Sequence, residues 1–564
     1  MPRNPLIPII SCIVILAFTA CNKVPNHAKY IPKDAVVVVG INARQIGKKI
    51  AWNAITGSKL FKQWMHDLHE KSSGDLEFGK LGIDGMNTFY VYIKNDKRFK
   101  DGTKITALIP LNSSNDWEAY ITKQLPGIHI STHGNLKVAM LNEGMYAGWN
   151  SKLLVVMNML PGTDQLMGNT PNANQAQLDE NALASEINVV LGTTKENSLI
   201  ENQRFNTLQQ EEHDVLFWMN YDILMSQLMA EGLADKMEGV SLTNTLWKNS
   251  AFAGGIDFDK GAIHGKARYY VSDAMLESSK EMGSLNIDKD LIERLPLKNP
   301  DVLMALHFAP KGLNAMMEKS GLLGLANMAL SQQNLSAAYV LDAFTGDMAM
   351  VLNNLEMHNE TEVDTLFGER TESTTLKTKA NALYVVKINK KDNFNKLFDL
   401  YVKENLLPLS NNLWAIPVTE SDTVFICLTD TYAIAGNKRA DINNFIAGGS
   451  KTEKSSPDAG DIKASSFTLF VDIKQMANTI SPIISHSPHD SAVYEQSKKL
   501  LDNILINAGS FKDNAYEYHM TINFINREEN SLINIMDFGM KINDINNNGQ
   551  KLSAFNTKNY QKNN

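Results

Sequence analysis

One recurring pattern constrains the fold of this chain more than any other feature. An acidic or polar residue, a short apolar run and a helix start follow one another, beginning at Asp34, Asp214, Asp301 and Ser466. Each copy has about five apolar residues, then a polar cap and helical spacing, which is typical of a strand that leads into a helix. Four such starts predict a repeated architecture.

The segments between these starts also correspond. Residues 109–117 align with 386–394 at an offset of 277, and residues 144–158 align without gaps with 423–437 at an offset of 279. The second pair has an apolar strand, a polar turn and another apolar strand, which predicts a β-hairpin in each half. Because these elements occur in the same order, we predict an internal duplication.

The fold class follows from the hairpins. Strands that alternate with helices are compatible with parallel βαβ units, but tight hairpins favour antiparallel pairing. We therefore predict an α+β fold with two similar lobes, each an antiparallel sheet with helices packed on one face. The predicted segments are a signal peptide (1–20), a tether (21–30), a first lobe (31–273), a helical connector (274–296), a second lobe (297–543) and a polar tail that frays (544–564).

The N-terminus indicates export. Arg3 is the only charged residue before Cys21, and an apolar run covers 6–18. Those thirteen residues are fewer than the roughly 20 that span a bilayer, so the run fits a signal peptide. Residues 18–21 (FTAC) resemble the lipobox of bacterial lipoproteins. The resemblance implies cleavage before Cys21 and a thioether-linked diacylglycerol on it. The alternative is a plain signal peptide with an incidental cysteine.

Residues 22–27 bear on location. They contain no acidic cluster of the kind that resembles a surface-export signal, and Asn22 is not the aspartate that often retains lipoproteins in the inner membrane. We therefore expect the lipid on Cys21 to hold the protein in the membrane at the periplasmic face of the outer membrane.

Composition narrows the class of protein and of partner. The chain is 43% hydrophobic and 21% charged, as in ordinary globular proteins. Its net charge of −8 and the lack of a basic stripe argue against a nucleic-acid partner. Of three cysteines, Cys12 leaves with the signal and Cys21 carries lipid, so Cys427 has no partner for an intramolecular disulfide.

Familiar catalytic motifs are missing from the sequence. There is no GxSxG, HExxH, Walker or GxGxxG pattern, so we predict no cofactor and no catalytic or metal-binding residue. His66 and His69 are three apart on a predicted helix, so both imidazoles could reach one metal ion. An exposed helix face, with charges at Lys62, Asp67 and Lys71, accounts for the same pattern.

The whole body resembles a known family. The FTAC motif, the Val24-Pro25 and 31–35 (IPKDA) entry, and the repeated strand–helix pattern are similar to a lipoprotein family of the Bacteroidota defined by a domain of unknown function. The resemblance covers about 31–542. It implies an envelope location and a duplicated body, and it supplies no catalytic residues.

Two functional hypotheses follow. The first is a non-enzymatic binding or scaffold protein whose partner is an envelope protein, a peptide or a glycan. The alternative is a hydrolase or other enzyme that acts on envelope polymer or peptide in a cleft between the lobes, where ligands often collect. For that alternative, Asp34, Asp214 and Asp301 are the carboxylates to test, although turn chemistry also explains their positions.

Overall fold

The computed structural model describes most of the chain after the apolar N-terminal run. The described residues are 24–50, 81–96, 102–142, 144–160, 180–228, 246–282, 286–366, 369–402, 406–410, 412–418, 422–449, 457, 462, 464–484 and 488–562. Cys21, His66 and His69 lie outside these ranges. Lipidation at Cys21 therefore stays a prediction, and the possible metal site at His66 and His69 stays untested.

The chain divides into two compact units, which we describe separately. Unit 1 comprises Met1–Lys48 and Met65–Asn220, and unit 2 comprises Lys49–Trp64 and Tyr221–Asn564. The expected first lobe, 31–273, therefore extends past unit 1 into a segment that belongs to unit 2.

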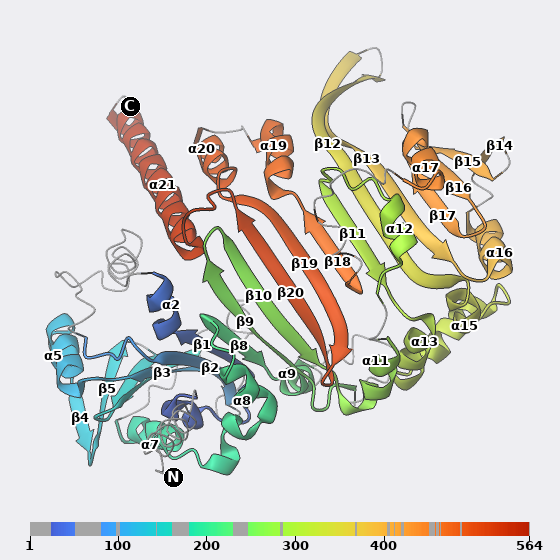
Figure 1. Cartoon of the computed structure of the whole chain (residues 1–564). Coiled ribbons are helices and arrows are strands. Elements are labelled where there is room, and N and C mark those ends of the chain that lie inside the picture. Colours follow the sequence, from blue (N-terminus) through green and yellow to red (C-terminus); the bar gives the residue numbers. More distant parts are fainter. Residues whose placement is uncertain are drawn as a thin grey trace, which may run out of the picture. The chain divides into compact units, whose positions relative to one another are not determined.

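Unit 1 is built on an antiparallel sheet with the strand order β8-β1-β2-β3-β7-β6-β5-β4 (Figure 1). Its first strand shows how the sequence specifies the sheet. The β-branched run Val37–Val39 favours extended backbone, and Val38 points into the core while its neighbours are half-buried. The strands are β1 (Val37–Asn42), β2 (Thr88–Asp96), β3 (Gly102–Pro110), β4 (Ile130–His133), β5 (Leu136–Asn142), β6 (Met145–Trp149), β7 (Leu153–Leu160) and β8 (Val215–Met219).

Short helices connect and cover these strands. Ser113 caps α5 by accepting a hydrogen bond from the Asp116 N–H, and α7 packs on β5 and β6. Trp117 of α5 meets Trp149 of β6 edge to face at 6.4 Å, and both are buried, as expected for core tryptophans. The helices are η1 (Asn26–Tyr30), α2 (Ala43–Lys49), α5 (Ser114–Gln124), α7 (Glu180–Leu191), η3 (Lys195–Asn197), η4 (Leu199–Glu201) and α8 (Gln203–Gln209).

Unit 2 contains a longer antiparallel sheet with the order β9-β10-β20-β19-β18-β11-β12-β13-β17-β16-β15-β14. Its strands are β9 (Ala251–Asp259), β10 (Ala262–Tyr270), β11 (Val302–His307), β12 (Phe344–Leu366), β13 (Glu369–Ile388), β14 (Leu407–Ser410), β15 (Leu413–Pro417), β16 (Thr423–Leu428), β17 (Tyr432–Gly436), β18 (Phe467–Val471), β19 (Leu501–Lys512) and β20 (Ala515–Phe524).

Helices also pack on the unit 2 sheet. The cluster around Leu291 of α12 and Phe445 of α17 includes Leu303 of β11 and Val385 of β13. The helices are α9 (Tyr221–Leu228), η7 (Asp273–Met275), α11 (Leu276–Met282), α12 (Lys289–Arg294), α13 (Pro310–Lys319), α14 (Leu322–Ser331), α15 (Ala337–Leu341), α16 (Lys391–Tyr401), α17 (Arg439–Ile446), α19 (Ile473–Ile484), α20 (Pro488–Ser497) and α21 (Ser531–Lys562).

The β12–β13 hairpin is much longer than the strands beside it. β11 pairs with β12 over 347–352, and β17 pairs with β13 over 383–387. Beyond a bulge between Asn353 and Glu356, residues 356–366 pair only with 369–379 among the described strands, and this ribbon extends past the rest of the sheet (Figure 1).

Helices together with antiparallel strands confirm the predicted α+β class. The predicted polar tail, 544–564, stays a prediction; helix α21 runs through this segment to Lys562. α20 lies against α21, and His489 Nε2 is 2.9 Å from Asn546 Oδ1.

Candidate functional site

A broad concave region in unit 1, which we call the polar groove, has a volume of about 1330 Å³. It is lined mainly by turns: the N-terminal segment, the turn before β2, the end of β3 with the start of α5, and the β6–β7 turn. Half of the lining side chains are uncharged and polar, and six of these are asparagines. These are Asn26, Asn87, Asn112, Asn115, Asn135 and Asn150.

Two of the turns are fixed by their own side chains. In the β6–β7 turn, Asn150 Oδ1 accepts hydrogen bonds from the N–H groups of Lys152 and Leu153 at 2.9 and 3.0 Å. Before β2, the Asp84 carboxylate accepts from the Met86 N–H and from Asn87 Nδ2. Such side-chain bonds replace backbone ones and hold the turn in shape. The groove is therefore preformed at these two turns.

The N-terminal wall of the groove is packed against the sheet. In η1, His27 is buried and its Nε2 lies 2.6 Å from the Thr88 carbonyl oxygen. Burial lowers the pKa of His27, so the ring is neutral, and a carbonyl only accepts, so Nε2 carries the proton. Because His27 and Ala28 of η1 are buried, the expected tether (21–30) includes part of the folded body.

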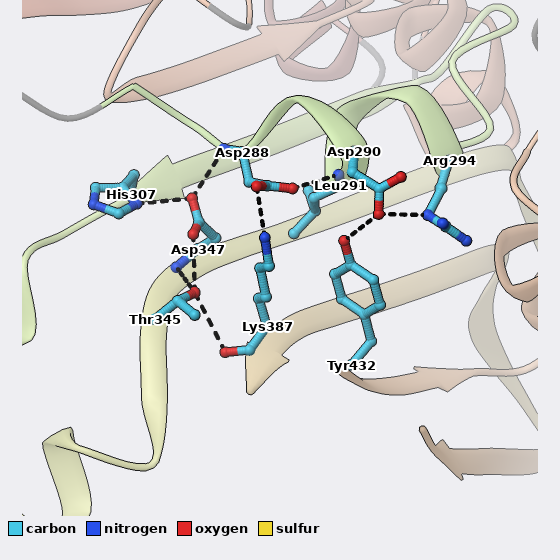
Figure 2. Close-up of polar contacts among 9 residues, drawn as sticks. All are labelled: Asp288, Asp290, Leu291, Arg294, His307, Thr345, Asp347, Lys387 and Tyr432. Atoms are coloured by element: carbon cyan, nitrogen blue, oxygen red, sulfur yellow. Dashed lines mark hydrogen bonds and ion pairs between the residues drawn. The ribbon is translucent and has the colours of Figure 1, made fainter. Parts of the chain in front are cut away.

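A second group of polar side chains lies in unit 2 (Figure 2). His307 Nδ1 is 2.7 Å from Asp347 Oδ1, and Asp347 also accepts from Thr345 Oγ1 at 2.9 Å and from the Asp288 N–H at 3.0 Å. Burial raises the pKa of Asp347, but the hydrogen bonds from His307, Thr345 and Asp288 outweigh burial and hold the net pKa below its ordinary value. Asp347 is therefore a carboxylate.

The same network holds helix α12 on the sheet. Asp288 caps α12 through the Leu291 N–H and accepts from Lys387 Nζ at 2.6 Å (Figure 2). Two residues further on, Asp290 accepts from Arg294 Nε and from the Tyr432 hydroxyl, both at 2.8 Å. Arg294 holds the pKa of Asp290 below its ordinary value. These contacts join α12 to β12, β13 and β17.

The histidine–carboxylate pair has the geometry of a general-base unit, which needs a substrate or nucleophile at the other ring nitrogen. That nitrogen, His307 Nε2, is buried and has no hydrogen-bond partner among the described residues. The polar groove does not include this pair, because the residues that line the groove belong to unit 1 and His307 belongs to unit 2. Through the contacts of Asp347 with His307, Thr345 and the Asp288 N–H, the pair also has a structural role, because it connects β11, β12 and the start of α12.

The structure does not gather the carboxylates considered from sequence. Asp34 precedes β1 and Asp214 precedes β8; these strands are antiparallel, so the two residues lie at opposite ends of the pair. Asp34 forms an exposed 2.7 Å ion pair with Lys94, and Asp214 is buried. Asp301 lies in unit 2, where its Oδ2 accepts from the Leu355 N–H and burial raises its pKa.

The asparagines of the polar groove were not predicted as a site. They come from five places that are distant in sequence: η1, the turn before β2, the connection from β3 into α5, the β4–β5 turn and the β6–β7 turn. Asparagine at turns and helix starts is ordinary local chemistry. Within the described ranges, no group of three or more His, Cys, Asp or Glu side chains could hold a metal ion. None of the described helices is both long and apolar enough to cross a membrane. Burial raises the pKa of the half-buried Cys427 thiol.

Comparisons with known proteins give little. No family model and no curated protein matches the chain. Crystal form III of TP0453 covers 46% of this chain and 88% of its own at 8% identity, with a TM-score of 0.24. Crystal form I covers 45% and 81% at 10% identity, with a TM-score of 0.23. Likeness at this level carries no argument about fold or function.

Proposed function

We propose that this protein is an envelope lipoprotein, anchored through lipid on Cys21 at the periplasmic face of the outer membrane, which binds a polar ligand in unit 1. The FTAC motif and the resemblance to a Bacteroidota lipoprotein family support the anchor. The binding role rests on one observation, the large polar groove with its preformed turns. Peptides and glycans of the envelope are the ligand classes that fit it.

The groove chemistry supports this ligand class. Each carboxamide offers two donors and an acceptor without a charge, which matches the hydroxyl and amide groups of glycans and peptides. Asn26, Asn115 and Asn135 are exposed at the groove. Aromatic Tyr30 lies beside them, and an aromatic ring gives apolar contact to a sugar or peptide.

We test binding with the purified mature chain, titrated with peptide and glycan fragments of the envelope by calorimetry. The variant Asn26→Ala/Asn115→Ala/Asn135→Ala removes three exposed carboxamides and should weaken binding about tenfold or more, since each lost hydrogen bond costs about 1 kcal/mol. Asn443→Ala/Asn444→Ala, on an exposed face of α17, is the matched control. Binding that ignores the groove variant contradicts the proposal.

The finer architecture is also a proposal: two lobes related by duplication, each with helices on one face of its sheet. The strand order β8-β1-β2-β3-β7-β6-β5-β4 recurs as β18-β11-β12-β13-β17-β16-β15-β14. A hairpin follows each series, β9–β10 after the first and β19–β20 after the second.

The pairing register supports the duplication independently of strand order. Leu108 pairs with Val155, and Val385 pairs with Ile434, so the offsets are 277 and 279. These are the two offsets at which the sequences align. The β6–β7 and β16–β17 turns also match, because Asn150 Oδ1 and Thr429 Oγ1 each accept two backbone N–H groups at equivalent positions.

The junction of the two hairpins is self-complementary. The β9–β10 and β19–β20 turns correspond at an offset of 253, from Ala262 to Ala515. In the β10–β20 ladder, Ala262 pairs with Asn523. The residues equivalent to these two at the same offset are Ala515 and Tyr270, and they also pair with each other. Such mutual pairing is typical of an isologous interface, in which two copies of the same hairpin present the same edge to each other.

The alternative function is an enzyme that acts on envelope polymer or peptide. The buried His307–Asp347 pair is the observation that favours it. Hydrolysis of an envelope substrate that His307→Gln abolishes, without loss of folding, would establish this alternative and overturn the binding proposal.

A further inference from the structure

The folded body begins very close to the proposed anchor. Val24 and Pro25 already line the polar groove, and η1 follows directly. Three peptide units separate Cys21 from Val24, and a chain of that length spans at most about 11 Å. In a chain with lipid on Cys21, the edge of the groove therefore lies within about 11 Å of the lipid-bearing residue.

A second, smaller groove of about 200 Å³ adjoins the polar groove. The two share Pro25 and Asn87, so they meet beside the N-terminal segment. The smaller groove is also lined by Arg44 and Lys48 of α2 and by Met86, whose side chain is 63% exposed. An exposed methionine next to cations suits a surface that meets both headgroups and acyl chains.

The charge around Pro25 is opposite to that of the whole chain. The protein has 54 Lys and Arg against 62 Asp and Glu. The carboxylates that line the two grooves are Asp84 and Glu212, and Lys137 is paired with Glu118 at 2.5 Å. We define the N-terminal face as Pro25 with the exposed cations that line the two grooves, Lys29, Arg44, Lys48 and Lys152.

We infer that the N-terminal face lies on the anionic phospholipid headgroups of the membrane that carries the anchor, with the polar groove open to the headgroup layer. The inference rests on the proposed anchoring at Cys21, and it places the polar groove next to the lipid headgroups. Short reach from the lipid holds this face at the surface, and the local positive charge matches the phosphates of the lipids. The ligand of the polar groove is then a polar group presented at the bilayer surface.

The expected strength follows from the charges. Each Lys or Arg near an anionic bilayer strengthens binding about fivefold, and the attraction decays within a Debye length of about 10 Å at 0.1 M salt. Loss of two of the four cations should therefore weaken binding on the order of 25-fold. Raising the salt concentration should weaken binding of the unaltered chain in the same way.

The experiment uses the mature full-length chain with Cys21→Ala, so that lipidation does not decide the outcome. Sedimentation with phosphatidylcholine vesicles is compared with sedimentation with vesicles that also contain phosphatidylglycerol. We expect binding to the anionic vesicles alone, weakened on the order of 25-fold in Lys29→Gln/Lys48→Gln. Both lysines are exposed, so the variant should melt like the parent chain.

The control replaces two exposed lysines of unit 2, Lys289→Gln/Lys438→Gln, which makes the same change in net charge. Equal weakening by both variants would overturn the inference, because net charge and not the N-terminal face would then govern binding. Absence of binding to anionic vesicles would also overturn it. Neither result touches the proposed binding role, since calorimetry with soluble peptides and glycans tests the groove without a membrane.

Discussion

His307 donates a 2.7 Å hydrogen bond from Nδ1 to Oδ1 of Asp347, directly opposite it in the β11–β12 ladder. The direction of the bond follows from the acceptor, because an ionised carboxylate has no proton to give. The proton is thus fixed on Nδ1, and the two side chains are 10% and 7% exposed. Asp347 thereby joins β11, β12 and the start of α12 through one carboxylate.

Removing this carboxylate should destabilise unit 2. Asp347→Ala leaves three donors, on His307, Thr345 and Asp288, without their acceptor. Breaking a buried charged network typically lowers the free energy of unfolding by about 3 kcal/mol. Chemical unfolding, followed with a spectroscopic probe in unit 2, measures this loss. Asp342→Ala is the control, because Asp342 forms an exposed pair with Lys390 and should cost less than about 1 kcal/mol. Equal losses in the two variants would argue against the network.

The same residue predicts an acid dependence. The pKa of Asp347 is lower in the folded state than in the unfolded chain, so its stabilising contribution is present above about pH 4 and is lost as the pH falls through the folded pKa. The difference in unfolding free energy between the parent and Asp347→Asn should therefore be largest near neutral pH. It should shrink on acidification. If the stability difference between the parent and Asp347→Asn grows at low pH, folding raises the pKa of Asp347, contrary to this prediction.

A buried ion pair in unit 1 gives an independent prediction. Lys104 Nζ of β3 lies 2.7 Å from Glu186 Oε2 of α7, and both side chains are 8% exposed. Glu186→Ala leaves a buried ammonium without its partner and should cost about 3–5 kcal/mol. Lys104→Met/Glu186→Leu removes both charges at similar volume and should cost far less. The free energy of unfolding of both variants, measured in denaturant, tests this prediction. A double variant that is less stable than Glu186→Ala would contradict it.

Sequence periodicity was sufficient to predict the class and much of the local structure. The β6–β7 and β16–β17 hairpins were predicted from apolar runs around short polar turns, and both turns form as expected. The offsets of 277 and 279 also match the observed registers, since alternation along a strand determines which residues can face each other.

Non-local pairing could not be predicted. The β10–β20 ladder joins Ala262 to Asn523, and nothing local in either strand specifies a partner so distant in sequence. The polar groove was missed for the same reason, because its asparagines meet only after folding. Near the N-terminus, local composition also did not show that His27, within the expected tether (21–30), is buried against the sheet.

The long β12–β13 ribbon offers a final test of the fold. Residues 356–366 and 369–379 pair only with each other among the described strands, and an isolated two-stranded hairpin is marginal in water. Replacing 357–378 by an Asn-Gly turn should therefore change the unfolding free energy by less than about 1 kcal/mol.

The matched control shortens the other long hairpin, β19–β20, by replacing 510–517 with the same turn. Here β20 also pairs with β10, with Glu517 opposite Arg268, and their side chains form a 3.1 Å ion pair. That deletion removes pairs on both edges of β20 and should unfold unit 2 at markedly lower denaturant concentration. If the two deletions lower the free energy of unfolding equally, contacts other than the β12–β13 hydrogen bonds must stabilise the ribbon. Its role would then be structural.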